Sequence, residues 1–93
     1  MGVELVTQTF QGRIGETFDA TPSSAGDPLE LVLSSCDESP HARPDQPAFS
    51  LFFDAPGGEL REQQIFTLRH SELGEFDLFL VPVGPQRYEA VIN

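Results

Sequence analysis

The stretch QIFTLRHSELGEFDLFLVP, residues 64–82, decides the fold because its apolar residues recur at every second position. A period of two is typical of a β-strand, in which successive side chains point to opposite faces of the sheet. A short turn at residues 71–74 divides the stretch into two strands. We predict that both strands bury one face against a core, and that this face carries Phe66, Leu68, His70, Phe76, Leu78 and Leu80.

Similar alternation on either side of this stretch predicts further strands at residues 17–20, 29–33, 49–54 and 87–93. Residues 7–15 predict one short helix, because Phe10 and Ile14 are four positions apart. We therefore expect an all-β fold, a small antiparallel meander of about six strands with a short N-terminal helix. Closure as a barrel and folding as a two-layer sandwich are both open, since both bury the same alternating positions.

Residues 34–47 predict a long exposed loop, because they carry three Pro and almost no apolar side chains. Asp, Glu, His and Cys are all metal ligands, and this segment contains Cys36, Asp37, Glu38, His41 and Asp45. Their spacing does not match the paired Cys and His ligands of a structural zinc site. We expect a solvated loop without a metal ion.

The chain has 93 residues, which predicts one small domain spanning residues 1–93. It carries 15 acidic residues, five Arg and no Lys, for a formal net charge of −10. Such a surface repels phosphate, so we predict no nucleic-acid binding. No apolar run approaches the length of about 18 residues that a membrane span needs, and no signal peptide is evident. We expect no membrane association and a cytoplasmic protein.

The sequence lacks the residue sets that are typical of catalysis, so we predict no enzyme activity, no catalytic residue and no cofactor. The absence of Lys excludes Schiff-base chemistry, and no G-x-S-x-G nucleophile motif occurs. Cys36 has no adjacent basic residue that would lower the pKa of its thiol. His70 shares a face with Phe66 and Leu68, so we interpret it as a hydrogen-bonded histidine at the edge of the core.

The second face of the predicted sheet is not purely polar, because apolar residues also occupy outward positions. Something should cover such a face. Either the N-terminal segment covers it with Val3, Leu5, Phe10 and Ile14, or a partner chain does. The interface candidates are Val32, Phe52, Phe79, Val81 and Val91.

The C-terminal half contains a fairly specific block, in which His70-x-x-Leu73-Gly74-Glu75 precedes LFLVPVG at 78–84 and RYEAVIN at 87–93. Further blocks are Phe10 with GETF at 15–18, and PAFSLFF at 47–53. Together they resemble a family of small bacterial proteins defined only as a domain of unknown function, over nearly the whole chain. The resemblance implies no catalytic residue. It implies a gene neighbourhood of phage-tail-collar-like or microcystin-dependent-type proteins, and hence an accessory or assembly role in a tail-like particle.

These observations favour a non-enzymatic protein-interaction or structural-assembly domain, which binds a protein partner or a second copy through the apolar face or residues 34–47. One alternative is an acidic decoy or inhibitor that occupies a basic protein surface, with binding that weakens steeply as salt rises. Another is a small-ligand-binding β-barrel, which requires a cavity or cleft.

Overall fold

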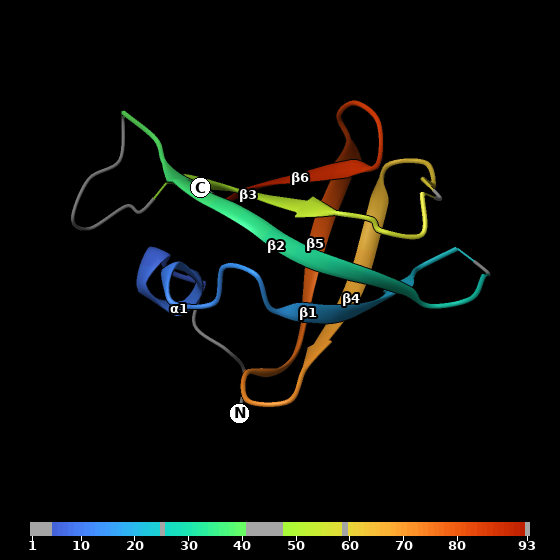
Figure 1. Ribbon diagram of the computed structural model, residues 1–93, viewed down its shortest axis with the longest axis horizontal. Helices are drawn as coiled ribbons and strands as arrows, with labels where there is room; N and C mark the ends of the chain where they lie inside the picture. Colours follow the sequence, from blue (N-terminus) through green and yellow to red (C-terminus); the bar gives the residue numbers. More distant parts are fainter. Residues whose placement is uncertain (1–4, 25, 41–47, 59, 93) are drawn as a thin grey trace.

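The strands predicted from the alternation are present in the computed structural model, which describes residues 5–24, 26–40, 48–58 and 60–92. Figure 1 shows one short helix lying beside the strands, at one end of the molecule. The described elements are α1 (Thr7–Gln11), β1 (Thr17–Pro22), β2 (Leu29–Glu38), β3 (Phe49–Asp54), β4 (Gln64–His70), β5 (Gly74–Pro82) and β6 (Arg87–Ile92).

The strands close into an antiparallel barrel, which decides between the barrel and the sandwich. Around the barrel the order is β1, β2, β3, β6, β5, β4, and β4 pairs with β1. Two three-stranded meanders are therefore joined side by side, which corrects the expected single meander. The reason is that β3 pairs with β6 along its whole length, so β4 lies on the opposite side of the ring.

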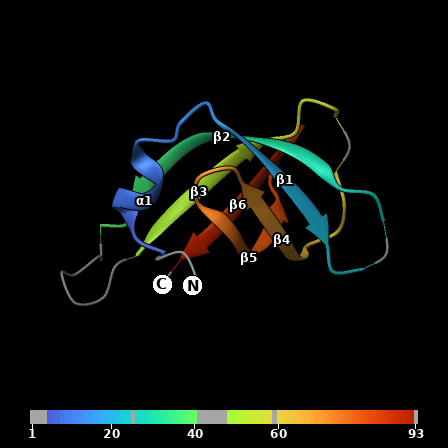
Figure 2. The same ribbon diagram turned by 90° about the horizontal axis from the view of Figure 1, so that it is seen from below.

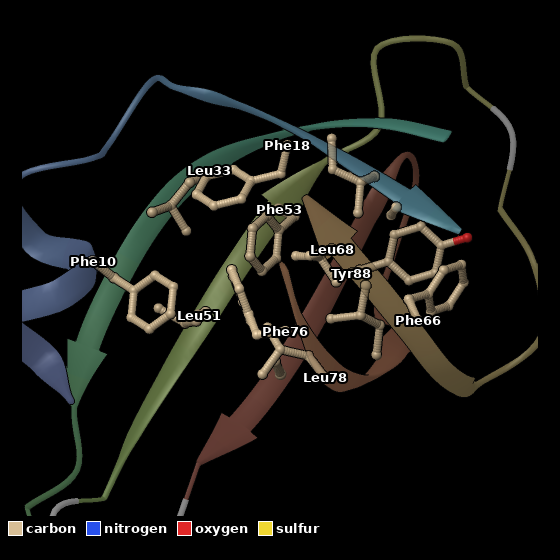
Figure 3. Close-up of a cluster of buried hydrophobic side chains, with 14 of the residues drawn as sticks. Phe10, Phe18, Leu33, Leu51, Phe53, Phe66, Leu68, Phe76, Leu78 and Tyr88 are labelled. Atoms are coloured by element: carbon tan, nitrogen blue, oxygen red, sulfur yellow. The ribbon is translucent and has the colours of Figure 1, made fainter. Parts of the chain in front are cut away.

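Alternation places one face of every strand inside the barrel. The buried rings pack edge to face, with ring centroids 5.6 Å apart for Phe18 and Phe53 and 5.5 Å apart for Phe66 and Tyr88. Figure 3 shows these rings and several leucines pointing toward one another from different strands. Each fully buried Phe or Leu contributes about 1.5–3 kcal/mol, so this core is the main stabilising term. The residues predicted for the buried face of 64–82 are all buried.

Chain outside the strands packs over both ends of the barrel, and Figure 2 shows α1 and the connection from β3 to β4 at opposite ends. At one end Phe10 of α1 is fully buried, with its ring centroid 6.1 Å from that of Phe49 and 5.8 Å from that of Phe76. At the other end the backbone N–H of Arg61 donates a hydrogen bond to the Tyr88 hydroxyl at 2.6 Å. This connection crosses the barrel because β3 and β4 lie opposite each other.

The helix is shorter than predicted, because α1 ends at Gln11 and the residues up to position 15 form turns. Gly12 follows the helix as its C-cap. Gly15 has a φ of 92°, a conformation that glycine adopts without strain, and its N–H donates to the carbonyl of Leu33 at 2.7 Å. This hydrogen bond connects the end of the turn after α1 to β2.

Strand β2 continues to Glu38, so residues 34–38 are not loop, contrary to the prediction. A β-bulge at Ser34 shifts the register of β2 against β3, and the Ser34 hydroxyl donates to the carbonyl of Phe52 at 3.0 Å. Beyond the bulge Cys36 pairs with Leu51 and packs against the core. A strict period of two does not recognise such a strand, because the extra residue exchanges its inward and outward positions. Residues 41–47 of the predicted loop lie outside the described residues.

The described part of the N-terminal segment does not cover the outer face of the sheet, so this alternative is wrong for Leu5, Phe10 and Ile14. Phe10 is buried among the core rings, and Leu5 packs against the same core. Ile14 remains 47% exposed, and Val3 lies outside the described residues. The segment packs over the end of the barrel because β5 and β6 pair at only two positions before they diverge, which leaves core side chains to be covered there.

Candidate functional site

Four of the five interface candidates lie on three neighbouring strands of the outer surface, β3, β6 and β5. Phe52 on β3 and Val81 on β5 are both cross-strand partners of Glu89 on β6. Phe79 is the partner of Ile65 on β4. We call the outward apolar residues of this region the outer apolar patch, and its members are Phe52, Ile65, Phe79, Val81 and Val91.

The outer apolar patch contains large side chains that are at least half exposed. The exposed fractions are 50% for Ile65, 51% for Phe79 and 60% for Val91, while Phe52 and Val81 are half-buried. Side chains of cross-strand partners lie roughly 5 Å apart at Cβ, so Ile65 and Phe79 form one continuous surface. Val81 and Phe52 are likewise joined through Glu89, and Val91 follows Glu89 on the same face of β6. An exposed apolar surface of this kind is typical of a binding site.

Two differences from the predicted site follow from strand order. Val32 does lie on the outer surface, but on β2, where it pairs with Thr17 and Asp54. It is therefore separated from the patch by the ion pair of Asp54 and Arg87. Ile65 was not predicted, although its outward parity was evident, because the sequence does not show that β4 brings it opposite Phe79.

Glu89 lies within the outer apolar patch and is half-buried. Within the described part of the chain its carboxylate has no hydrogen-bond or ion-pair partner. Arg87, two positions earlier on the same strand face, is paired through Nε with Asp54 Oδ1 at 3.1 Å. The patch therefore combines apolar side chains with one carboxylate that no described cation neutralises.

His70 forms a second cluster, at the start of β1 and the turn between β4 and β5. Its Nδ1 accepts hydrogen bonds from the backbone N–H groups of Glu72 at 3.0 Å and Leu73 at 3.2 Å. The proton of the neutral ring is therefore on Nε2, which donates to Glu16 Oε1 at 2.6 Å. The ring also packs on Phe18, with centroids 4.7 Å apart. The prediction of a hydrogen-bonded histidine at the core edge is confirmed.

The His70 cluster joins sequence blocks that are far apart in the chain. Glu16 and Phe18 belong to the block GETF, and His70 opens the block that contains Leu73 and Gly74. Arg13 extends the cluster, since its guanidinium bonds to the Glu72 carboxylate and lies 3.6 Å from that of Glu16. Both ring nitrogens of His70 have hydrogen-bond partners, so this histidine links the β4–β5 turn to Glu16, which precedes β1. It is therefore poorly placed to act as a general base.

Cys36 is half-buried between strand neighbours. Burial, together with the negative charges of Asp37 and Glu38, raises the pKa of its thiol. A raised pKa lowers the fraction of reactive thiolate at neutral pH. Within the described ranges, no three His, Cys, Asp or Glu side chains gather into a group that could hold a metal ion, and His41 and Asp45 lie outside those ranges.

An open cleft of about 480 Å³ lies at the end of the barrel that the β3–β4 connection crosses. Its walls combine apolar and polar groups, including the ion pair of Asp54 and Arg87. The remaining lining residues are Ala55, Pro56, Val83, Pro85 and Gln86.

Comparisons with known proteins bear on the family alone. None of the helices in the described residues is long and apolar enough to cross a membrane. No curated protein and no solved structure matches the chain. A family model does match, over residues 5–92, and its span includes the outer apolar patch, Glu89 and the His70 cluster. The chain therefore belongs to the family Domain of unknown function (DUF6916).

Proposed function

We propose that this protein is a non-enzymatic interaction domain that binds a protein partner through the outer apolar patch. The observation that carries the proposal is the exposure of Ile65, Phe79 and Val91, each at least half exposed on neighbouring strands. Burying such side chains against a partner is favourable by about 25 cal/mol for each Å² removed from water. The family resemblance adds a finer proposal, that the partner belongs to a phage-tail-like particle in which the domain has an accessory or assembly role.

The His70 cluster supports a binding role over catalysis. Both ring nitrogens of His70 already have partners, and the side chain is 5% exposed. A general base must reach the proton that it removes, and here the accepting nitrogen is occupied by two backbone N–H groups.

Site-specific photo-crosslinking in the native host tests the proposal. A photoreactive phenylalanine analogue at position 79 should crosslink to a partner protein, whereas the same analogue at Thr17, which is exposed on β1, should not. The substitution Phe79→Glu, combined with the analogue at Val91, should abolish the crosslink while the circular dichroism spectrum stays unchanged. Crosslinking that is equal at positions 79 and 17 would contradict the proposal.

A second candidate is the acidic decoy, which occupies a basic protein surface. The observation in its favour is the net charge of −10, a balance in which the five arginines are already counted. Three of them, Arg13, Arg69 and Arg87, are paired with carboxylates of the protein itself. Binding by this mechanism should weaken steeply between low and physiological salt, because exposed charges are screened. Binding through the outer apolar patch should persist.

A further inference from the structure

We propose that Glu89 determines which partner the outer apolar patch accepts, and that the partner is a protein segment presenting an arginine or lysine framed by apolar side chains. The inference rests on the proposed function, since it names the chemistry of the partner for the same surface.

Glu89 lies among apolar residues of neighbouring strands. Its cross-strand partners are Val81 on one side and Phe52 on the other. Val91 follows two positions later on the same strand face. Glu89 is therefore half-buried with apolar neighbours in three directions, and its fourth side borders Arg87.

Glu89 has no charged partner among the residues that the structure describes. In the fourth direction lies Arg87, which is bonded to Asp54, and within the described residues no cation pairs with Glu89. Three other outward carboxylates on β3 and β5 do have partners, as Asp54 pairs with Arg87, Glu75 pairs with Arg69, and Asp77 accepts from the Thr67 hydroxyl. Glu89 is therefore a charge available for a group that comes from outside.

The apolar side chains around Glu89 make its charge selective for a basic partner. When a partner covers the patch, the apolar side chains exclude water from the carboxylate, and an unpaired charge in that position becomes costly. A partner that supplies a guanidinium or ammonium group avoids this cost, because the interaction of opposite charges strengthens as water is excluded. A partner with an acidic or purely apolar segment leaves the Glu89 carboxylate unpaired and does not avoid this cost.

Charge also argues against a second copy as the occupant. Each copy carries a net charge of −10, and a two-fold symmetric contact would bring two patches together, each containing Glu89. Like charges in one interface are destabilising. The occupant that fits is a basic partner.

The test uses two capped peptides of alternating valine and threonine whose central residue is arginine in one and norleucine in the other. Binding to the ¹⁵N-labelled protein is followed by amide chemical shifts. The arginine peptide should shift amides of the patch, and Glu89→Gln should weaken its binding by about tenfold, a change equivalent to about 1.4 kcal/mol. Glu89→Gln should not weaken binding of the norleucine peptide. The matched control is Glu30→Gln, which removes one exposed charge on β2 outside the patch.

The outcomes separate the two proposals. If both peptides shift the patch amides and neither responds to Glu89→Gln, the role of Glu89 is wrong and the patch remains a binding surface. If neither peptide shifts patch amides at millimolar concentration, or the shifts lie around Glu30 instead, both proposals are wrong. Glu89→Gln should not lower the melting temperature, because Glu89 has no partner within the described residues that the change could remove.

Discussion

At the scale of single residues, His70 shows how one side chain satisfies several polar groups at a barrel rim. Its imidazole accepts from two backbone N–H groups and donates to the Glu16 carboxylate. Buried polar groups are costly when they lack partners, so this one ring stabilises both the β4–β5 turn and the start of β1.

The substitution His70→Ala should lower the free energy of unfolding by about 2–4 kcal/mol, because it leaves a cavity beside Phe18 and removes three hydrogen bonds. Urea denaturation measures the change. The control is the neighbouring Arg69→Ala, which breaks an exposed ion pair and should change stability little. Similar losses for the two variants would contradict the structural role of His70.

Cys36 provides a prediction that depends on pH. Because burial and then Asp37 and Glu38 raise the pKa of the thiol, the folded protein should react with iodoacetamide more slowly than a cysteine peptide at pH 7 to 8. The rate should rise as the pH passes the raised pKa, and unfolding in urea should remove the difference. Equal rates for the folded protein and the peptide at pH 8 would show that the thiol is not shielded.

The raised pKa of the Cys36 thiol also predicts how the stability of the protein changes with pH. The folded state holds the thiol proton to a higher pH than the unfolded chain does. The contribution of Cys36 to stability is therefore fully present below the ordinary thiol pKa, and it is lost as the pH rises through the raised pKa. Replacement by Ser should reduce this alkaline loss.

Among the elements, α1 is a helix of five residues that buries Thr7 and Phe10. It has no side-chain N-cap and no acidic residue in its first turn. Isolated helices of this length are not stable, so α1 is held by tertiary packing, chiefly by Phe10 against Phe49 and Phe76.

Phe10→Ala should therefore lower the free energy of unfolding by about 3–5 kcal/mol, the usual cost of removing a buried aromatic ring. It should also expose amides of α1 to hydrogen exchange. Ile14→Ala is the control, because Ile14 is 47% exposed and its truncation should change stability by less than about 0.5 kcal/mol. An equal effect of both substitutions would mean that Phe10 is not the contact that holds α1.

At the scale of the whole molecule, net charge opposes the compact state. The many like charges behind the net charge of −10 repel one another, whereas ion pairs such as Arg69–Glu75 and Arg87–Asp54 act in the other direction. Salt screens both the repulsion between like charges and the attraction within ion pairs. Because the repulsion involves many more charges, we expect its loss to have the larger effect on stability.

Raising sodium chloride from about 10 mM to about 150 mM shortens the screening length from about 30 Å to about 8 Å. The melting temperature should rise over this range, as measured by calorimetry. A fall would mean that the ion pairs contribute more to stability than self-repulsion removes. Sodium sulfate at matched ionic strength serves as a comparison, since sulfate also strengthens apolar burial.

The alternation alone shows which side chains face inward, because the period of two is a local property of a strand. Phe66, Leu68 and His70 were therefore predicted as buried, and Phe79 and Val91 as outward, before any pairing was known. The same reasoning fails beyond Ser34, where the bulge exchanges the inward and outward positions, so the continuation of β2 to Glu38 is not recognised from the pattern.

The order of the strands does not follow from any local pattern, because closure of the barrel depends on pairings between residues far apart in the chain. That order selected the barrel over the sandwich and joined β3 to β6. It brought Ile65 to Phe79, left Glu89 between Phe52 and Val81, and separated Val32 from the patch. It also supplied Glu16 to His70, a contact across 54 positions of sequence that no local pattern contains.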